Sequence, residues 1–283
     1  MKRLTLITLL FCCIGFQNAE GKLKGPKEAF SFVQFTDPQF GFMDNAGTCS
    51  LFPEKEQMEK VVSILKYRKP AFTICTGDFI HLTHNDSATK VYEDYIETIR
   101  ACGTKVYMVP GNHDLPKVDE QHLTYYRQHY GEDRWAFKYR NCAFIGLNSS
   151  IMQIGSPQQE AEHYAWLEAQ LKKVRKCKYK FVFMHIAFFI HDMDEKEQYF
   201  NQPLSIREKY LKLLEGYGVQ AVFCGHLHQN AYAKYHDIEI VTSNAVGRDL
   251  SGENKHGMTL IEVTPTGYRH KYMELDDPKW RNP

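Results

Sequence analysis

The chain has 283 residues, of which 43% are hydrophobic and 24% charged, which is typical of a globular protein with a sizeable core. Its 35 basic and 34 acidic residues leave a net charge of +1 and form no long basic run. We therefore expect neither a nucleic-acid partner nor a membrane partner. No internal repeat, low-complexity stretch or linker interrupts the chain, so we expect a single domain over residues 22–283.

The first 21 residues have the order of a secretory signal peptide. Lys2 and Arg3 precede an apolar run over residues 4–16 that is too short to span a bilayer, and Ala19 and Gly21 fit cleavage after Gly21. The alternative is a buried N-terminal helix, which we disfavour because it would follow two cations and end without a cap. We expect a signal peptide at residues 1–21 and a secreted or otherwise extracytoplasmic protein, periplasmic if the host is bacterial.

Beyond this leader, short apolar runs alternate with segments of helical period. The runs predict strands at 30–36, 71–76, 105–109, 135–139, 142–148, 179–185, 219–223, 238–241, 258–264 and 268–274. The periodic segments predict helices at 54–67, 89–102, 118–130, 158–174 and 205–217. This alternation favours an α/β fold with partly parallel strands, and the strand-rich end after residue 231 favours antiparallel hairpins that complete a sheet.

The cysteines exclude two kinds of site. Cys12 and Cys13 lie in the leader, and none of the others forms a C-x-x-C pair, so we expect neither structural zinc nor dithiol redox chemistry. Cys75 and Cys224 lie within apolar runs and are predicted to be buried.

Polar residues capable of binding metal follow the predicted strands where each strand ends. A single strand-end His or Asp is usually structural, as a hydrogen-bonded histidine or a turn cap. Several together favour a binding site, because the carboxyl ends of parallel strands meet at one edge of a sheet. The segments concerned are Asp37, Gly77-Asp78, Gly111-Asn112-His113-Asp114, His185 and Gly225-His226-Leu227-His228.

The residue types at these strand ends narrow the chemistry. They offer carboxylate, amide and imidazole donors without cysteine, which suits two divalent ions such as Mn, Fe or Zn. Two such ions polarise a phosphoryl group and generate hydroxide at neutral pH, which suits the hydrolysis of phosphate esters. The donors are sufficient for a first ion at Asp37, Asp78 and His228 and a second ion at Asn112, His185 and His226, with Asp78 as the bridge.

The ordered set D-P-Q, GD, GNHD, His185 and GHLH resembles the calcineurin-like metallophosphoesterase superfamily over nearly all of the mature chain. This resemblance implies a four-layer α-β-β-α sandwich with two mixed sheets and the same division of metal ligands. It also implies that His113 is the general acid that protonates the leaving alkoxide. Asp114 is our second candidate catalytic residue, because it is adjacent to His113 and could orient it. The alternative role for His113 is to anchor its loop.

Gln39 departs from the common pattern of the superfamily, in which a histidine occupies this position. Its amide oxygen is a weaker metal ligand than imidazole, and we expect Gln39 to bind the first metal. The D-P-Q-F variant, together with Tyr199-Phe200-Asn201, is similar to the calcineurin-like phosphoesterase domain containing protein 1 branch. That branch includes a protein serine/threonine phosphatase.

We expect hydrolysis of phosphomonoesters, in a phosphoprotein or a small phosphoester, by attack of a metal-bridging hydroxide. One alternative is a phosphodiesterase or nucleotide pyrophosphohydrolase on the same site. Another is a metal-binding protein without turnover, in which Gln39 leaves the first site empty. The segment 186–202 is either a lid or substrate-binding loop, or a packed loop. The candidate substrate clamps are His81, His84 and Arg248, and the alternative for each is an ordinary surface residue.

Overall fold

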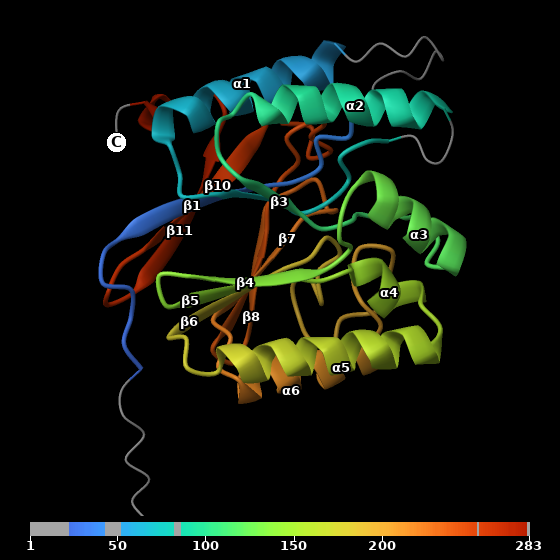
Figure 1. Cartoon of the computed structure of the whole chain (residues 1–283), viewed down its shortest axis with the longest axis vertical. Coiled ribbons are helices and arrows are strands. Elements are labelled where there is room, and N and C mark those ends of the chain that lie inside the picture. The colour runs from blue at the N-terminus through green and yellow to red at the C-terminus, as the bar shows by residue number, and fades with distance from the viewer. Residues whose placement is uncertain (1–22, 43–51, 82–85, 254, 282–283) are drawn as a thin grey trace, which may run out of the picture.

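The computed structural model describes residues 23–42, 52–81, 86–253 and 255–281. Two β-sheets pack face to face, and helices cover both outer faces (Figure 1). The predicted four-layer sandwich with mixed sheets is therefore confirmed. The predicted leader and His84 lie outside the described residues.

The first sheet has the strand order β11-β10-β1-β2-β3. β1 runs parallel to β2, and β2 to β3, whereas β10 pairs antiparallel with both β1 and β11. The carboxyl ends of the three parallel strands therefore lie at one edge. The strands are β1 (Phe30–Phe35), β2 (Thr73–Cys75), β3 (Val106–Met108), β10 (Gly257–Val263) and β11 (Tyr268–Glu274).

The second sheet has the order β4-β5-β6-β7-β9-β8. β5, β6, β7 and β9 are parallel, and the antiparallel strands β4 and β8 form the two edges. The strands are β4 (Trp135–Tyr139), β5 (Cys142–Gly146), β6 (Tyr179–Phe183), β7 (Ala221–Cys224), β8 (Ala231–Tyr235) and β9 (Ile238–Thr242).

Helices α1 and α2 lie over the first sheet, α5 and α6 lie over the second, and α3 and α4 lie at one end of the sandwich (Figure 1). α5 begins at a capping box in which Ser156 and Gln159 satisfy each other's backbone N–H groups, with Pro157 at the first turn. Among the described helices, none has the length and apolarity needed to cross a bilayer. The helices are α1 (Phe52–Arg68), α2 (Asp86–Arg100), α3 (Glu120–His129), α4 (Ser149–Ile154), α5 (Pro157–Val174) and α6 (Leu204–Gly216); a short 3₁₀ helix (Pro278–Trp280) follows β11.

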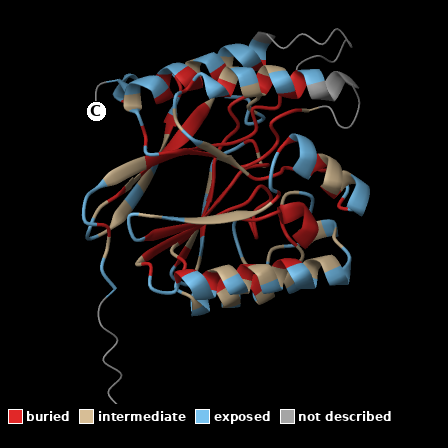
Figure 2. Cartoon of the chain, viewed as in Figure 1, coloured by how far each residue is buried: buried red, intermediate tan, exposed pale blue. Residues whose placement is uncertain are grey.

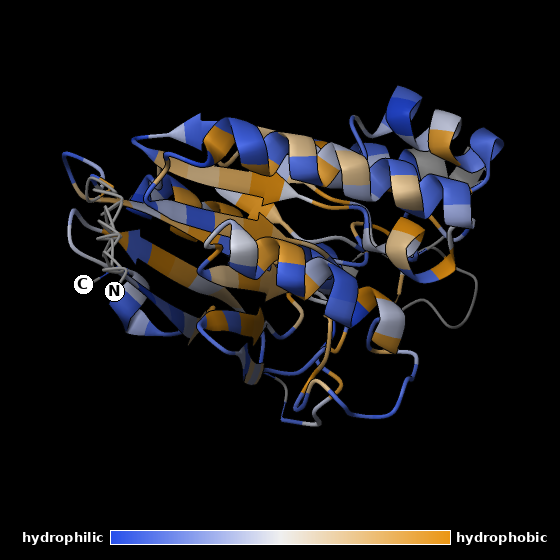
Figure 3. Cartoon of the chain, turned by 90° about the horizontal axis from the view of Figure 1, so that it is seen from below, coloured by the Kyte–Doolittle hydropathy of each residue, from blue (hydrophilic) through white to orange (hydrophobic). Residues whose placement is uncertain are grey.

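The space between the sheets is filled largely by aromatic side chains. Phe32 of β1 contacts Phe144 of β5 edge to face, with ring centroids 5.3 Å apart, and Phe183 stacks on Phe223 at 5.5 Å. The interior strands β5, β6 and β7 are buried and apolar, whereas the edge strands are partly exposed and the helices expose polar faces (Figures 2 and 3). Burial of these rings stabilises the packing of one sheet against the other.

Three described elements were not predicted from the sequence: β8, α4 and the 3₁₀ helix Pro278–Trp280. β8 is an edge strand in which only Ala233 is buried, so it lacks the apolar pattern of an interior strand. α4 is a single short helix that begins where Asn148 accepts hydrogen bonds from the N–H groups of Ser150 and Ile151. The predicted burial of Cys75 and Cys224 is confirmed, since both are fully buried.

Candidate metal centre

The loops that follow β1, β2, β3, β6 and β7 bring the predicted metal-binding residues together. His185 Nε2 lies 3.2 Å from Asp78 Oδ2 and 3.1 Å from Asn112 Oδ1. His228 Nε2 lies 3.3 Å from Asp37 Oδ1. Possible ligand atoms of Asp78, His185 and His226 all lie within 4.8 Å of one another, so donors from both sheets meet at one point.

Backbone carbonyl groups set the orientation of three histidine rings. His185 Nδ1 lies 2.8 Å from the carbonyl oxygen of Thr76, and His228 Nδ1 lies 2.5 Å from that of Arg248. A ring N–H that donates to a carbonyl leaves the other ring nitrogen as a metal ligand. In both rings the free nitrogen is Nε2, which faces a carboxylate.

His226 has the opposite arrangement. Its Nε2 lies 3.1 Å from the carbonyl oxygen of Tyr199, which leaves Nδ1 as the ligand atom. The ring centroid is 4.9 Å from that of His185. Each of these two rings can therefore present one lone pair to the same ion.

The electrostatic field at the site favours a positive charge. Burial lowers the pKa of His185, but the carboxylates of Asp78 and Asp37 outweigh it and raise that pKa to about 9. Burial raises the pKa of Asp37, but His228 and His185 outweigh it and lower that pKa below its usual range. Oxygen and nitrogen lone pairs that converge in this way fit a bound cation.

Two buried oxygens support the same conclusion. Among the described residues, neither Asp37 Oδ1 nor Gln39 Oε1 accepts a hydrogen bond, although both side chains are buried. Asp37 Oδ1 has ion-pair contacts with His228 Nε2 (3.3 Å) and His185 Nε2 (3.9 Å). An unsatisfied buried oxygen is costly unless it binds a proton donor or a metal ion. The donor set therefore fits two divalent ions.

Gln39 also contacts the predicted bridging ligand. Its Nε2 donates to Asp78 Oδ2 over 3.1 Å, and its backbone N–H donates to the carbonyl oxygen of Asp78 over 2.9 Å. Through this contact Gln39 orients the Asp78 carboxylate, and its Oε1 remains the predicted ligand of the first metal.

The backbone is strained at the predicted ligands. Five of them have a positive φ, a conformation that costs residues other than glycine about 1–3 kcal/mol. The neighbouring glycines permit close approach, because a Cβ at Gly111 would collide with the Asp78 carboxylate and a Cβ at Gly225 with Thr36 and Asp37. The φ values are 51° at Asp37, 40° at Gln39, 52° at Asp78, 69° at His226 and 53° at His228.

His113 lies beside the metal-binding residues and is half-buried. Its backbone N–H donates to Asp78 Oδ1 over 2.9 Å, and its Nδ1 lies 3.2 Å from the carbonyl oxygen of His81. With Nδ1 bonded to that carbonyl, Nε2 is free to carry a proton to a leaving group.

Asp114, predicted as a catalytic residue, binds backbone groups. Its carboxylate accepts hydrogen bonds from the N–H groups of Asp78 (2.7 Å), Phe79 (2.9 Å), Ile80 (3.4 Å) and Gly111 (2.8 Å). It therefore ties the loop after β2 to the loop after β3 and holds Asp78 in its strained conformation.

Of the candidate substrate clamps, Arg248 and His81 line one side of the site. The guanidinium of Arg248 lies 4.7 Å from the ring centroid of Phe42, and Phe42 contacts His81 edge to face at 4.3 Å. His81 in turn stacks on His113 at 4.6 Å. Among the described residues, Arg248 has no carboxylate partner, so its charge is available to a substrate.

Sequence reasoning did not identify Tyr199 as part of the site. Its hydroxyl accepts a hydrogen bond from Asn112 Nδ2 over 2.9 Å, and its ring lies 4.6 Å from that of His226. The length of the segment 186–202 predicted a lid or substrate-binding loop, or a packed loop, but it gave no role to this residue.

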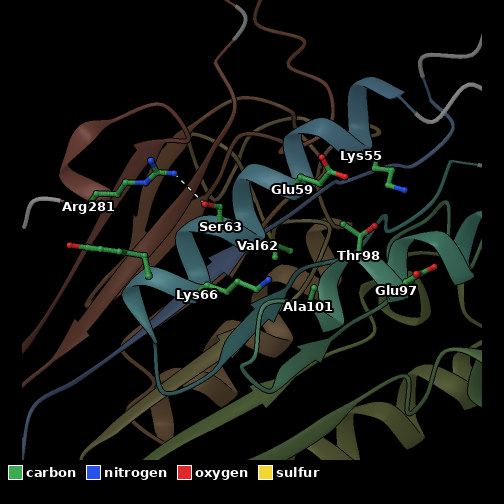
Figure 4. Close-up of a pocket in the computed structure, with 10 residues that line it drawn as sticks. Lys55, Glu59, Val62, Ser63, Lys66, Glu97, Thr98, Ala101 and Arg281 are labelled. Carbon is green, nitrogen blue, oxygen red and sulfur yellow. Dashed lines mark hydrogen bonds between the residues drawn. The ribbon is translucent and has the colours of Figure 1, made fainter.

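A separate groove of about 860 Å³ lies between α1 and α2, on the outer face of the first sheet (Figure 4). It is lined by charges of both signs, including Lys55, Glu59 and Lys66, and Arg281 there donates to Ser63 over 3.2 Å. None of the predicted metal-binding residues lines it.

Comparison with known proteins agrees with this geometry. The family model "Calcineurin-like phosphoesterase" matches residues 30–230, and the chain belongs to that family of metal-dependent phosphoric ester hydrolases. The chain is 32% identical over 275 residues to serine/threonine-protein phosphatase CPPED1 of Bos taurus, covering 91% of this chain and 87% of that protein.

Two further similarities concern a different activity and the fold. The chain is 29% identical to the probable glycerophosphodiester phosphodiesterase GpdQ of Arcobacter nitrofigilis, over 66% of this chain and 68% of that protein. The crystal structure of a dimetal phosphatase from Danio rerio has the same fold, with a TM-score of 0.66 at 12% identity, over 86% of this chain and 98% of that one.

Proposed function

We propose that this protein is a dinuclear-metal phosphatase that removes phosphate from serine or threonine side chains of proteins. The observation that carries the proposal is the convergence of carboxylate, amide and imidazole donors from both sheets, with buried oxygens lacking hydrogen-bond partners. The similarity to the serine/threonine-protein phosphatase of Bos taurus supports the same substrate class.

The residues present fit two ions. Asp37, Gln39 and His228 would hold the first, Asn112, His185 and His226 the second, and Asp78 would bridge them. When bound, such ions polarise the phosphoryl group and lower the pKa of coordinated water, and Mn, Fe and Zn all accept these ligands.

The protein itself provides orientation and a proton. Asp114 fixes the Asp78 loop, and Gln39 fixes the Asp78 carboxylate. His113 donates a proton from Nε2 to the leaving oxygen of serine or threonine, since Nδ1 is bonded to the His81 carbonyl group.

The rim of the site suits a protein substrate. Tyr199 is 59% exposed and its hydroxyl contacts Asn112, and Leu250 is 48% exposed and its N–H donates to the carbonyl oxygen of His228. Together with Arg248 on the ring of Phe42, they offer both apolar and cationic contacts to a peptide around the phosphorylated residue.

A phosphodiesterase is the second candidate, and the similarity to the glycerophosphodiester phosphodiesterase of Arcobacter nitrofigilis favours it. The test is the kcat/KM of the Mn²⁺-loaded protein for a phosphoserine peptide, p-nitrophenyl phosphate and bis(p-nitrophenyl) phosphate. We expect both monoesters to be preferred over the diester, and a preference for the diester would overturn the proposal.

The Gln39→His variant separates an enzyme from a metal-binding protein without turnover. A wild-type chain that is inactive, and that gains turnover only when Gln39 becomes His, would show that the first site is disabled. We expect wild-type turnover, because Gln39 already contacts Asp78 and retains an unsatisfied oxygen.

We also propose that the protein is exported, on the basis of the charged, apolar and small-residue segments over residues 1–21. Sequencing the N-terminus of the protein from its native host tests this. A first residue of Lys22 is expected, and a retained Met1 or Lys2 would contradict export by a cleaved signal peptide. An exported phosphatase would act on extracytoplasmic phosphoproteins.

A further inference from the structure

The segment 186–202, between β6 and α6, is a packed loop that is held in place by hydrogen bonds to the side chains of Arg207 and Glu195. Arg207 is fully buried and donates hydrogen bonds to the carbonyl groups of Met193 (2.8 Å), Glu195 (2.7 Å) and Gln202 (2.7 Å). The Glu195 carboxylate accepts hydrogen bonds from three consecutive backbone N–H groups over residues 190–192. The position of the loop is therefore fixed by the protein before any ligand binds.

This loop presents Tyr199 to the second metal site through two different groups. The carbonyl oxygen of Tyr199 lies 3.1 Å from His226 Nε2, and its hydroxyl lies 2.9 Å from Asn112 Nδ2. Gln153 of α4 donates to the carbonyl groups of Tyr199 (3.5 Å) and Asn201 (3.1 Å), which holds this part of the loop against the rest of the protein. One residue thus contacts two predicted ligands of the same ion.

The hydrogen bond between the Tyr199 hydroxyl and Asn112 determines which end of the Asn112 amide would face an ion at the second site. An amide has an oxygen at one end and an NH₂ group at the other, and only the oxygen can bind a metal. Asn112 Oδ1 lies 3.1 Å from His185 Nε2, inside the cluster, while Nδ2 points outward to the Tyr199 hydroxyl. If the hydroxyl were absent, the amide would lose the acceptor that holds its NH₂ group away from the ion.

We propose that Tyr199 is a positioning residue of the second metal site: its hydroxyl fixes the amide of Asn112, and its carbonyl group fixes the ring of His226. The inference rests on the proposed function only in treating Asn112 and His226 as metal ligands. Because the loop is fastened by Arg207 and Glu195, this orientation is present before the metal binds.

The test is a calorimetric titration of the EDTA-treated protein with Mn²⁺. Tyr199→Phe keeps the ring and the backbone carbonyl group but removes the hydroxyl. We expect it to weaken Mn²⁺ at one of the two sites by about 10-fold or more, within the range for residues that orient metal ligands. Tyr67→Phe is the matched control, because Tyr67 is 57% exposed on α1 and lines the separate groove; its Mn²⁺ affinity should equal that of the wild type.

A double-mutant cycle with Asn112→Asp makes the test specific. A carboxylate has an oxygen at either end, so the Tyr199 hydroxyl no longer decides which kind of atom faces the ion. In the Asn112→Asp background, the effect of Tyr199→Phe should fall below about 2-fold, which is the usual limit for independent sites.

Three outcomes would overturn the proposal. The first is that Tyr199→Phe leaves the Mn²⁺ affinity unchanged. The second is that Tyr199→Phe weakens Mn²⁺ binding equally with Asn and with Asp at position 112. The third is that Tyr199→Phe raises the KM for the substrate while the Mn²⁺ affinity is unchanged. The last would mean that Tyr199 acts through its contact with the substrate alone and does not position the metal ligands. A wild-type protein that binds Mn²⁺ but hydrolyses no phosphomonoester would contradict the proposed function alone, since the titration does not depend on turnover.

Discussion

At the scale of single residues, His113 is the proposed general acid. Its Nδ1 is bonded to the His81 carbonyl group, so Nε2 alone is free to protonate a leaving oxygen. We predict that His113→Gln lowers kcat on a phosphoserine peptide by about 10²–10⁴-fold, the usual contribution of general acid catalysis. Steady-state kinetics measure this effect.

The same variant should lose far less activity on p-nitrophenyl phosphate, because nitrophenolate leaves without protonation. Equal losses on both substrates would contradict the role as general acid and would indicate that His113 anchors its loop.

Asp114 has a structural role at the same site. The Asp114 carboxylate accepts hydrogen bonds from the backbone N–H groups of Asp78, Phe79 and Gly111. In Asp114→Asn, an NH₂ group would replace one of the two accepting oxygens and face these donors. We predict a loss of about 2–4 kcal/mol in the free energy of unfolding, because buried donors are left unpaired. Urea denaturation measures it, and exposed Glu132→Gln, as control, should change stability by less than about 0.5 kcal/mol. A fully stable Asp114→Asn protein would contradict this role.

The side chains at the strand ends could be predicted from the sequence, whereas several contacts between them could not. Asp37, Asp78, His185 and His228 converge because parallel strands end at one edge, and that pattern is visible in the sequence. The carbonyl groups that orient the histidines belong to Thr76, Tyr199 and Arg248, and every residue has such a group. The position of Asp114 next to His113 in the sequence also could not show that its carboxylate binds backbone N–H groups, because the side chains of neighbouring loop residues point in different directions.

At the scale of single elements, α4, α5 and α6 are joined by a buried histidine. His163 of α5 is fully buried; its Nε2 accepts a hydrogen bond from the N–H of Asn148, and its Nδ1 lies 3.1 Å from the hydroxyl of Tyr210. Burial, and to a smaller extent the charge of Arg134, lowers the pKa of His163 to about 3. The imidazole is therefore neutral in the folded protein.

This lowered pKa makes stability depend on pH. Between about pH 6.5 and pH 3 the unfolded chain binds a proton at His163 that the folded protein does not, so stability falls as the pH falls. We predict a loss of about 1.4 kcal/mol per pH unit below 6.5 from this residue. Urea denaturation from pH 7 to pH 4.5 measures it. His163→Gln should be less stable at pH 7 but have a shallower dependence on pH, and an unchanged slope would contradict the prediction.

The agreement between predicted and observed strands depended on the residue pattern of each strand and not on its place in the sheet. β4 and β11 begin and end at the predicted residues, since aromatic or alternating patterns and clear turns bound them. β8 was missed because its exposed side chains lack the apolar pattern. α4 was missed because one short helix has too few turns to establish a period.

At the scale of the whole molecule, the metal centre joins the two sheets. Asp37 and Asp78 follow strands of the first sheet, whereas His185, His226 and His228 follow strands of the second. An ion held by these residues would crosslink the two halves of the sandwich and would bind only the folded protein.

We predict that Mn²⁺ stabilises the EDTA-treated protein by about 2.7 kcal/mol when its free concentration is 100 times the Kd. Thermal unfolding with and without Mn²⁺ measures the effect. Asp78→Asn should abolish most of it, because the bridging carboxylate serves both ions. An equal shift in wild type and Asp78→Asn would place the ion elsewhere.

The measurement that tests the central claim most directly is the metal content of the active protein. Mass spectrometry of the metal-loaded wild type and of Asp78→Asn would be done on the same samples used to assay a phosphoserine peptide. We predict two ions per chain together with turnover in the wild type, and loss of both in Asp78→Asn. Turnover by a protein that holds one ion or none, or turnover that persists in Asp78→Asn, would contradict a dinuclear phosphatase.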